Sequence, residues 1–152
     1  MKKPSKEARE ATELLHEVFM AHKRNFQALA KERGLSPQQA ATLLNLAPGE
    51  GTTMNAIAEF LMCDASNVTG IVDKLESRGL IVRQSAENDR RIKMLAVTEK
   101  GREMRERLCA RLLEAPPALV ATRPEFRRQL TDLLRTMIGD QAGATPPDPR
   151  GA

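Results

Sequence analysis

The sequence predicts a mainly α-helical protein with a small β-hairpin, which places it in the α+β class. Apolar residues recur at helical spacing through most of the 152 residues and alternate, as in strands, only over residues 80–85 and 92–97. Four phenylalanines, without tyrosine or tryptophan, predict a core of aliphatic residues and methionine. The length suits one compact domain, or one module with helical additions.

The first two helices have clear boundaries in the sequence. One is predicted over residues 5–33 and ends at Gly34, which suits a left-handed cap. The next begins at a capping box formed by Ser36 and Gln39 and breaks at Pro48.

Residues 53–98 contain two short helices joined by a tight turn and followed by the hairpin. Thr53 and Asp64 are suitable N-caps, and each helix has one apolar stripe. The opposite side of the second helix is small and mostly hydroxyl-bearing: Ser66, Thr69, Gly70, Asp73 and Ser77. Such a surface can enter a major groove and hydrogen-bond base edges. The order predicts a winged helix-turn-helix over residues 35–98 that binds duplex DNA.

Helical segments flank this module on both sides. Thr98 is expected to cap a helix that stops at Pro116, and a second capping box of Thr122 and Glu125 is expected to start the last helix. Residues 5–34 and 99–138 carry more apolar surface than the module can cover, so we expect them to form a dimerisation layer between two copies. The Pro-rich tail, residues 139–152, is predicted to be disordered.

From Ser36 to Gly101 the sequence resembles the MarR (multiple antibiotic resistance regulator) family. Residues 67–81 resemble its recognition helix, residues 89–98 its wing signature, and residues 98–101 the start of its next helix, with Val97 where leucine is typical. The resemblance implies a winged-helix repressor that is an intertwined homodimer. It further implies a pseudo-palindromic operator and, in many members, release from DNA by a small ligand or an oxidant.

The candidate DNA-binding residues follow from this arrangement. On the recognition helix they are Ser66, Asn67, Thr69, Gly70, Lys74 and Arg78. At the tip of the wing, Arg90 and Arg91 can enter a narrow minor groove, where the negative potential is deepest. Asp89 and Asp73 are poorly placed to face phosphates, so we expect them to orient or pair with an arginine of the wing.

The sequence says less about an effector. A pocket between the module and the dimer layer is expected to use residues that are equally ordinary core candidates: His22, Phe26, Leu44, Leu46 and Met62. Cys63 and Cys109 are interpreted as small, buried apolar residues. In the family that the chain resembles, the oxidation-sensing members use a cysteine in the first long helix, where this chain has none.

Several other function classes are disfavoured. Scarce aromatics argue against base stacking on single strands or RNA, and a net charge of +4 suits a polyanion without proving one. His16 and His22 lie on different faces of one helix, and no catalytic grouping is local, so we expect neither an enzyme nor a cofactor or metal. Without a signal peptide or membrane segment the chain is expected to be cytoplasmic. A winged-helix protein-interaction module and a redox- or metal-responsive regulator remain alternatives.

Overall fold

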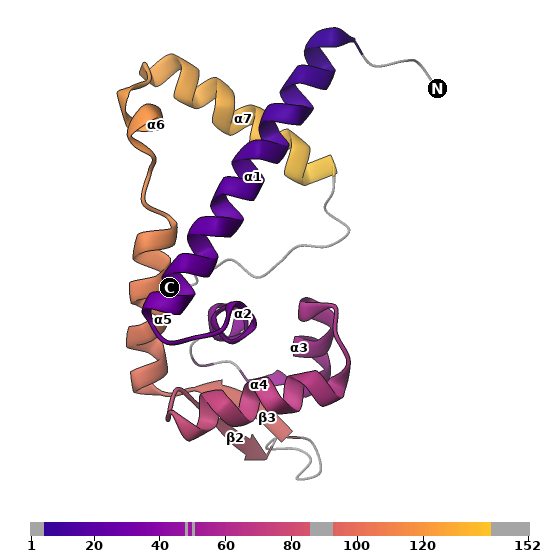
Figure 1. Cartoon of the computed structure of the whole chain (residues 1–152), viewed down its shortest axis with the longest axis vertical. Coiled ribbons are helices and arrows are strands. Elements are labelled where there is room, and N and C mark those ends of the chain that lie inside the picture. Colours follow the sequence, from indigo (N-terminus) through magenta and orange to yellow (C-terminus); the bar gives the residue numbers. More distant parts are fainter. Residues whose placement is uncertain (1–4, 48, 50, 86–92, 141–152) are drawn as a thin grey trace. The chain divides into compact units, whose positions relative to one another are not determined.

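The computed structural model describes residues 5–47, 49, 51–85 and 93–140 (Figure 1). In chain order its elements are α1 (Lys6–Glu32), α2 (Pro37–Asn45), β1 (Thr52–Thr53), α3 (Met54–Leu61), α4 (Ala65–Ser77), β2 (Ile81–Ser85), β3 (Lys93–Val97), α5 (Glu99–Leu112), α6 (Pro117–Ala121) and α7 (Pro124–Asp140). The chain up to Leu112 forms one compact unit and the chain from Leu113 a second. Each is described by itself.

The N-caps of the first unit mostly follow the sequence. Ser36 and Gln39 form the predicted capping box at the start of α2, and the Thr53 hydroxyl accepts from the backbone N–H of Ala56 at the start of α3. Asp64 occupies the N-cap position of α4, but its carboxylate makes no capping hydrogen bond within the described part of the chain. The start of α4 therefore retains backbone donors that no cap satisfies.

Glycine ends α1 and α4 in the same way. Gly34, with φ +66°, follows the end of α1, and the N–H of Leu35 bonds the Ala30 carbonyl oxygen at 2.9 Å. Gly79, with φ +69°, does the same after α4. Only glycine adopts this left-handed conformation without steric cost, so both helix ends are fixed by sequence.

The described sheet is antiparallel, with the order β1–β3–β2. β2 and β3 form the predicted hairpin, with Ile81 opposite Val97. β1 adds Thr52 opposite Leu95 on the far side of β3. This short strand was not predicted, because two residues are too few to show an alternating pattern.

The core of the first unit centres on α2, which contacts α1, α3, α4 and α5 (Figure 1). Its largest fully buried apolar side chains come from every layer: Leu43, Leu46, Ile57, Leu75, Leu80, Ile81, Leu95 and Leu108. α4 packs its inner stripe on this core and also contacts β2. Its opposite side is therefore held outward.

The second unit contains α6 and α7. α6 was not predicted; Pro116 is its N-cap and Pro117 its first residue, so the proline pair starts a short helix, whereas α5 ends earlier than predicted, at Leu112. The predicted capping box at Thr122 is wrong by one residue, because α7 begins at Pro124 and the Thr122 hydroxyl donates to the Ala118 carbonyl oxygen.

The last helix is longer than predicted. α7 continues to Asp140, two residues into the stretch expected to be disordered, and the rest of that stretch, residues 141–152, lies outside the described residues. Among the described helices, none is both long and apolar enough to cross a bilayer.

Candidate nucleic-acid interface

The outer side of α4 is a continuous polar surface, which we call the α4 face. Its residues are all exposed: Ser66, Asn67, Thr69, Gly70, Asp73 and Lys74. On the opposite side of the same helix Val68, Val72 and Leu75 are completely buried. This sharp division holds the α4 face away from the core.

The side chains of the α4 face are short and partly satisfied within the helix. The Thr69 hydroxyl donates to the Ala65 carbonyl oxygen at 3.1 Å and keeps its lone pairs for an outside donor. The side-chain amide of Asn67 makes no hydrogen bond among the described residues, and a methyl group at Gly70 would meet nothing within 4 Å. A flat partner such as a groove floor can therefore approach α4 closely.

Asp73 forms an ion pair with an arginine of the wing. The Arg83 guanidinium, on β2, lies 2.5 Å from Asp73 Oδ1 and also contacts the Glu76 carboxylate. The hydrogen bond that the guanidinium donates to Asp73 raises the pKa of Arg83, so this group stays protonated. The sequence predicted that Asp73 pairs with a cation of the wing but did not identify Arg83. Because Arg83 is shared with Glu76, the ion pair offsets only part of the repulsion between Asp73 and a phosphate backbone near α4.

Arg78 has a different place from the one predicted. Its guanidinium donates to the carbonyl oxygens of Gly34 at 2.5 Å and Arg33 at 3.0 Å, both at the end of α1. These acceptors engage both terminal nitrogens of the side chain. The Arg78 side chain therefore holds the end of α1, and its predicted contact with DNA stays a prediction.

The predicted wing-tip residues, Asp89, Arg90 and Arg91, lie outside the described residues. Their roles stay predictions. The strands that carry the tip are described, and the Lys93 ammonium of β3 donates to the Ser85 hydroxyl of β2 at 3.2 Å. The base of the wing is thus fixed on α4 by Arg83 and across the hairpin by Lys93.

The five residues predicted to line an effector pocket do not come together. Leu46 is completely buried in the core, whereas the Met62 side chain is 92% exposed in the turn after α3, where its backbone is left-handed with φ +50°. His22 is exposed, and Phe26 and Leu44 pack against the core. Within one chain α2 aims Leu46 inward and the turn aims Met62 at solvent, so these two side chains do not line one cavity, and an effector pocket between the module and the dimer layer stays a prediction.

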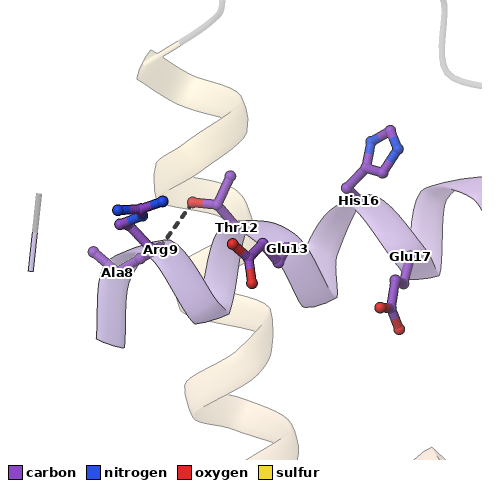
Figure 2. Close-up of a pocket in the computed structure, with 6 residues that line it drawn as sticks. All are labelled: Ala8, Arg9, Thr12, Glu13, His16 and Glu17. Atoms are coloured by element: carbon purple, nitrogen blue, oxygen red, sulfur yellow. Dashed lines mark hydrogen bonds between the residues drawn. The ribbon is translucent and has the colours of Figure 1, made fainter. Parts of the chain in front are cut away.

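A surface hollow instead lies along α1 (Figure 2). It is lined by Ala8, Arg9, Thr12, Glu13, His16 and Glu17, all of them exposed. The Thr12 hydroxyl donates to the Ala8 carbonyl oxygen, and His16 and Glu17 point to opposite sides of the helix (Figure 2). Because these side chains do not converge, they form no catalytic or ligand-binding group.

Cys63 and Cys109 are half-buried, and neither forms a disulfide among the described residues. Burial raises the pKa of the Cys109 thiol, and the positive charge of Arg105 only partly opposes this. A thiol of raised pKa is a poor nucleophile at neutral pH. Among the described residues, no group of three His, Cys, Asp or Glu side chains could hold a metal ion.

Sequence reasoning missed a buried arginine on α5. Only 6% of Arg105 is exposed, and its Nε donates to the Leu44 carbonyl oxygen, at the end of α2, at 3.3 Å. One feature could have revealed it: Arg105 lies at helical spacing between Gly101 and Leu108, on the buried side of α5.

The sequence also matches known proteins. Residues 33–92 match a profile of the MarR family. The HTH-type transcriptional regulator YkoM of Bacillus subtilis is 30% identical over 107 residues, which span 70% of each chain. The transcriptional repressor MprA of Escherichia coli is 34% identical over 81 residues, 52% of this chain and about half (46%) of MprA.

Solved structures agree with the fold. A MarR family protein from Bacillus stearothermophilus superposes with a TM-score of 0.81 at 19% identity and covers 92% of this chain and 99% of its own. A MepR mutant of Staphylococcus aureus bound to an oligodeoxyribonucleotide superposes with a TM-score of 0.63 at 23% identity and covers 86% of this chain and 97% of its own. CouR of Rhodococcus jostii RHA1, bound to p-coumaroyl-CoA, superposes with a TM-score of 0.59 at 31% identity and covers 82% of this chain and 88% of its own.

These matches agree with the structure, in which Arg83 joins the hairpin to a helix, α4, with an exposed polar face. Relatives and profile alike are those of transcriptional regulators rather than enzymes. The chain belongs to the MarR family and is a transcriptional regulator with a DNA-binding winged-helix fold.

Proposed function

We propose that the protein is a homodimeric repressor that binds a pseudo-palindromic operator in duplex DNA and is released by a small effector. The observation that carries the proposal is the α4 face. It is exposed, small and polar, it is backed by a fully buried stripe, and its one carboxylate is paired with Arg83.

On the operator, the α4 face enters the major groove. The Asn67 amide presents a donor and an acceptor side by side, the pattern that pairs with an adenine edge. Ser66 and Thr69 offer hydroxyls next to it, and Lys74 is placed to contact a phosphate. The wing arginines, Arg90 and Arg91, contact the minor groove. The oligodeoxyribonucleotide complex of the related MepR fold supports this class of partner.

Exposed apolar residues of the terminal helices support the homodimer. On α1, four side chains are 40–65% exposed: Leu14, Leu15, Val18 and Phe19. On α7, six are 38–65% exposed: Phe126, Leu130, Leu133, Leu134, Met137 and Ile138. Each stripe is left in water by its own unit, and a two-fold partner can bury stripes of this kind.

Repression and effector release rest on the relatives. MprA is named a repressor, and CouR was solved with p-coumaroyl-CoA bound. The five residues predicted for a pocket do not form one in a single chain. We therefore propose that binding of the effector requires a second copy of the chain.

Sedimentation velocity and footprinting on one sample test this function. At micromolar concentration the protein is expected to sediment as a dimer and to protect two half-sites in the duplex upstream of its own coding region. Leu133→Asp should convert it to a monomer and remove the footprint. Thr136→Asp adds the same charge to α7 off the apolar stripe and should change neither. A monomeric wild type, or DNA binding that salt does not weaken, would contradict the proposal.

In cells, a reporter behind the footprinted duplex is expected to rise when the protein is absent. A reporter that falls instead would mean that the protein activates transcription. The reporter tests repression alone, whereas sedimentation and footprinting test the dimer and the half-sites.

A further inference from the structure

The C-terminal end of α4 is tied to the end of α1 by one side chain. The two hydrogen bonds from the Arg78 guanidinium reach the carbonyl oxygens of Arg33 and Gly34. Arg33 is the C-cap of α1, and Gly34 follows it. The carbonyl end of a helix is the negative end of its dipole, so a guanidinium is favourable there. Arg78 therefore caps a helix other than its own.

The backbone of the same region is tied to α5. The Lys100 ammonium donates to the Arg78 carbonyl oxygen at 2.8 Å, and the Thr98 hydroxyl donates to the Gly79 carbonyl oxygen at 2.7 Å. Arg78 thus reaches α1 through its side chain and α5 through its carbonyl. We call this pair of connections the Arg78 anchor.

We propose that the Arg78 anchor sets the angle of α4 against α1 and α5 and thereby the operator spacing that the dimer accepts. The inference rests on the proposed homodimer, in which the two copies of α4 must meet successive major grooves about 34–36 Å apart. Arg78 acts as a positioning residue and makes no DNA contact.

The leverage of the anchor is large enough to matter. α4 has 13 residues and is about 20 Å long, with Ser66 and Asn67 at the end opposite Arg78. A tilt of about 10° at Arg78 would move that end by about 3.5 Å, close to the ~3.4 Å between successive base pairs. A loosened anchor would therefore let α4 meet half-sites shifted by one base pair.

The test uses Arg78→Met, which keeps an apolar stem and removes the donors. Arg107→Met is the matched control, because Arg107 is exposed and pairs only with Glu103 on its own helix in the described contacts. Each protein is titrated on the operator and on duplexes whose half-sites are one base pair closer or farther apart. Thermal melting and salt dependence are measured on the same samples.

Wild type and Arg107→Met are expected to prefer the native spacing by about tenfold. Arg78→Met should lose about tenfold on the native spacing and bind all three duplexes within about threefold, with an unchanged salt slope. Lys100→Met removes the other connection and should broaden the spacing preference too, so it decides the matter if Arg78→Met fails to fold.

Two results would overturn the anchor. One is that Arg78→Met or Lys100→Met keeps the spacing preference of the wild type, or that the wild type shows no such preference. The other is a salt slope reduced by about 1 in Arg78→Met, which would make Arg78 a phosphate contact. Wild type that is monomeric or protects no paired half-sites would instead refute the proposed homodimer.

Discussion

Two helical glycines show how different one residue type can be in two places. Gly101 lies where α5 crosses the hairpin, and a methyl group there would overlap the Leu80 carbonyl oxygen and lie 2.7 Å from Val97 Cγ2. Gly70 lies on the open side of α4 and a methyl group there would meet nothing. Gly101 therefore allows packing, whereas Gly70 keeps the α4 face shallow.

Gly101→Ala should lower the free energy of unfolding by about 1–3 kcal/mol, because the backbone of α5 must move away from the hairpin. Urea denaturation followed by circular dichroism measures the change. Equal stability of wild type and variant would mean that α5 does not pack this closely.

Gly70→Ala should have opposite effects on folding and on binding. Alanine favours the helix over glycine, so the free energy of unfolding should rise by about 0.5–1 kcal/mol. The added methyl group lies on the α4 face and should weaken operator binding. Urea denaturation and a DNA titration on one preparation measure both, and unchanged operator affinity would place the DNA elsewhere.

Cys109 gives a pH dependence. Because burial raises its pKa, the thiolate fraction at pH 8 is below that of a free thiol, and iodoacetamide should react more slowly with Cys109 than with N-acetylcysteine. The difference between the two alkylation rates should become smaller as the pH rises further. A Cys63→Ser background isolates Cys109, and urea should abolish the difference. Alkylation as fast as that of the reference thiol at pH 8 would count against the burial of Cys109.

Some residue roles could be predicted and others could not. The exposure of Asn67 and Thr69 followed from the apolar stripe on the other side of α4. Arg78 and Arg105 could not be assigned, because their acceptors are backbone carbonyls 44 or more residues away in sequence. Because every residue has a backbone carbonyl, the sequence does not show which one accepts the hydrogen bond.

At the scale of elements, the wing depends on its attachment to α4. Arg83 joins β2 to two carboxylates of α4, with the guanidinium side chain 28% exposed. Charge-assisted hydrogen bonds of this kind contribute more than an open surface pair. The contact turns the hairpin and the recognition helix into one structural piece.

Arg83→Met should therefore lower the free energy of unfolding by about 1–2 kcal/mol and weaken DNA binding as well, since the wing loses its fixed place. Arg102→Met is a control on α5, whose ion pair to Glu99 is an exposed i,i+3 pair. Urea denaturation and an operator titration give both values. A loss of stability no larger than that of Arg102→Met would mean that the ion pair with α4 does not stabilise the fold more than an exposed surface pair does.

The boundaries of elements were predicted best where capping chemistry is local. Ser36, Thr53, Gly34 and Gly79 mark helix ends through contacts within a few residues. β1 and α6 were missed because each is too short to show a period. β1 also depends on a partner strand some 40 positions along the chain, which no local pattern reveals.

For the whole molecule, the α+β winged-helix fold followed from the order of periodic segments, and the family matches agree with it. The terminal apolar stripes also followed, and they carry the proposed dimer. The pocket did not follow, since Phe26, Leu46 and Met62 satisfy the same apolar pattern whether they face a ligand, a core or water. Tertiary packing alone decides between these.

The central claim is that the α4 face reads sequence. Titrations of operator and scrambled duplex at several salt concentrations test it most directly, with Asn67→Ala and Thr69→Ala beside Lys74→Ala. Each of the first two should cost about 1–3 kcal/mol on the operator and little on scrambled DNA. Lys74→Ala should weaken both equally and reduce the salt slope by about 1. Equal losses on both duplexes for Asn67→Ala and Thr69→Ala would contradict the claim, because α4 would then position the protein while sequence is read elsewhere.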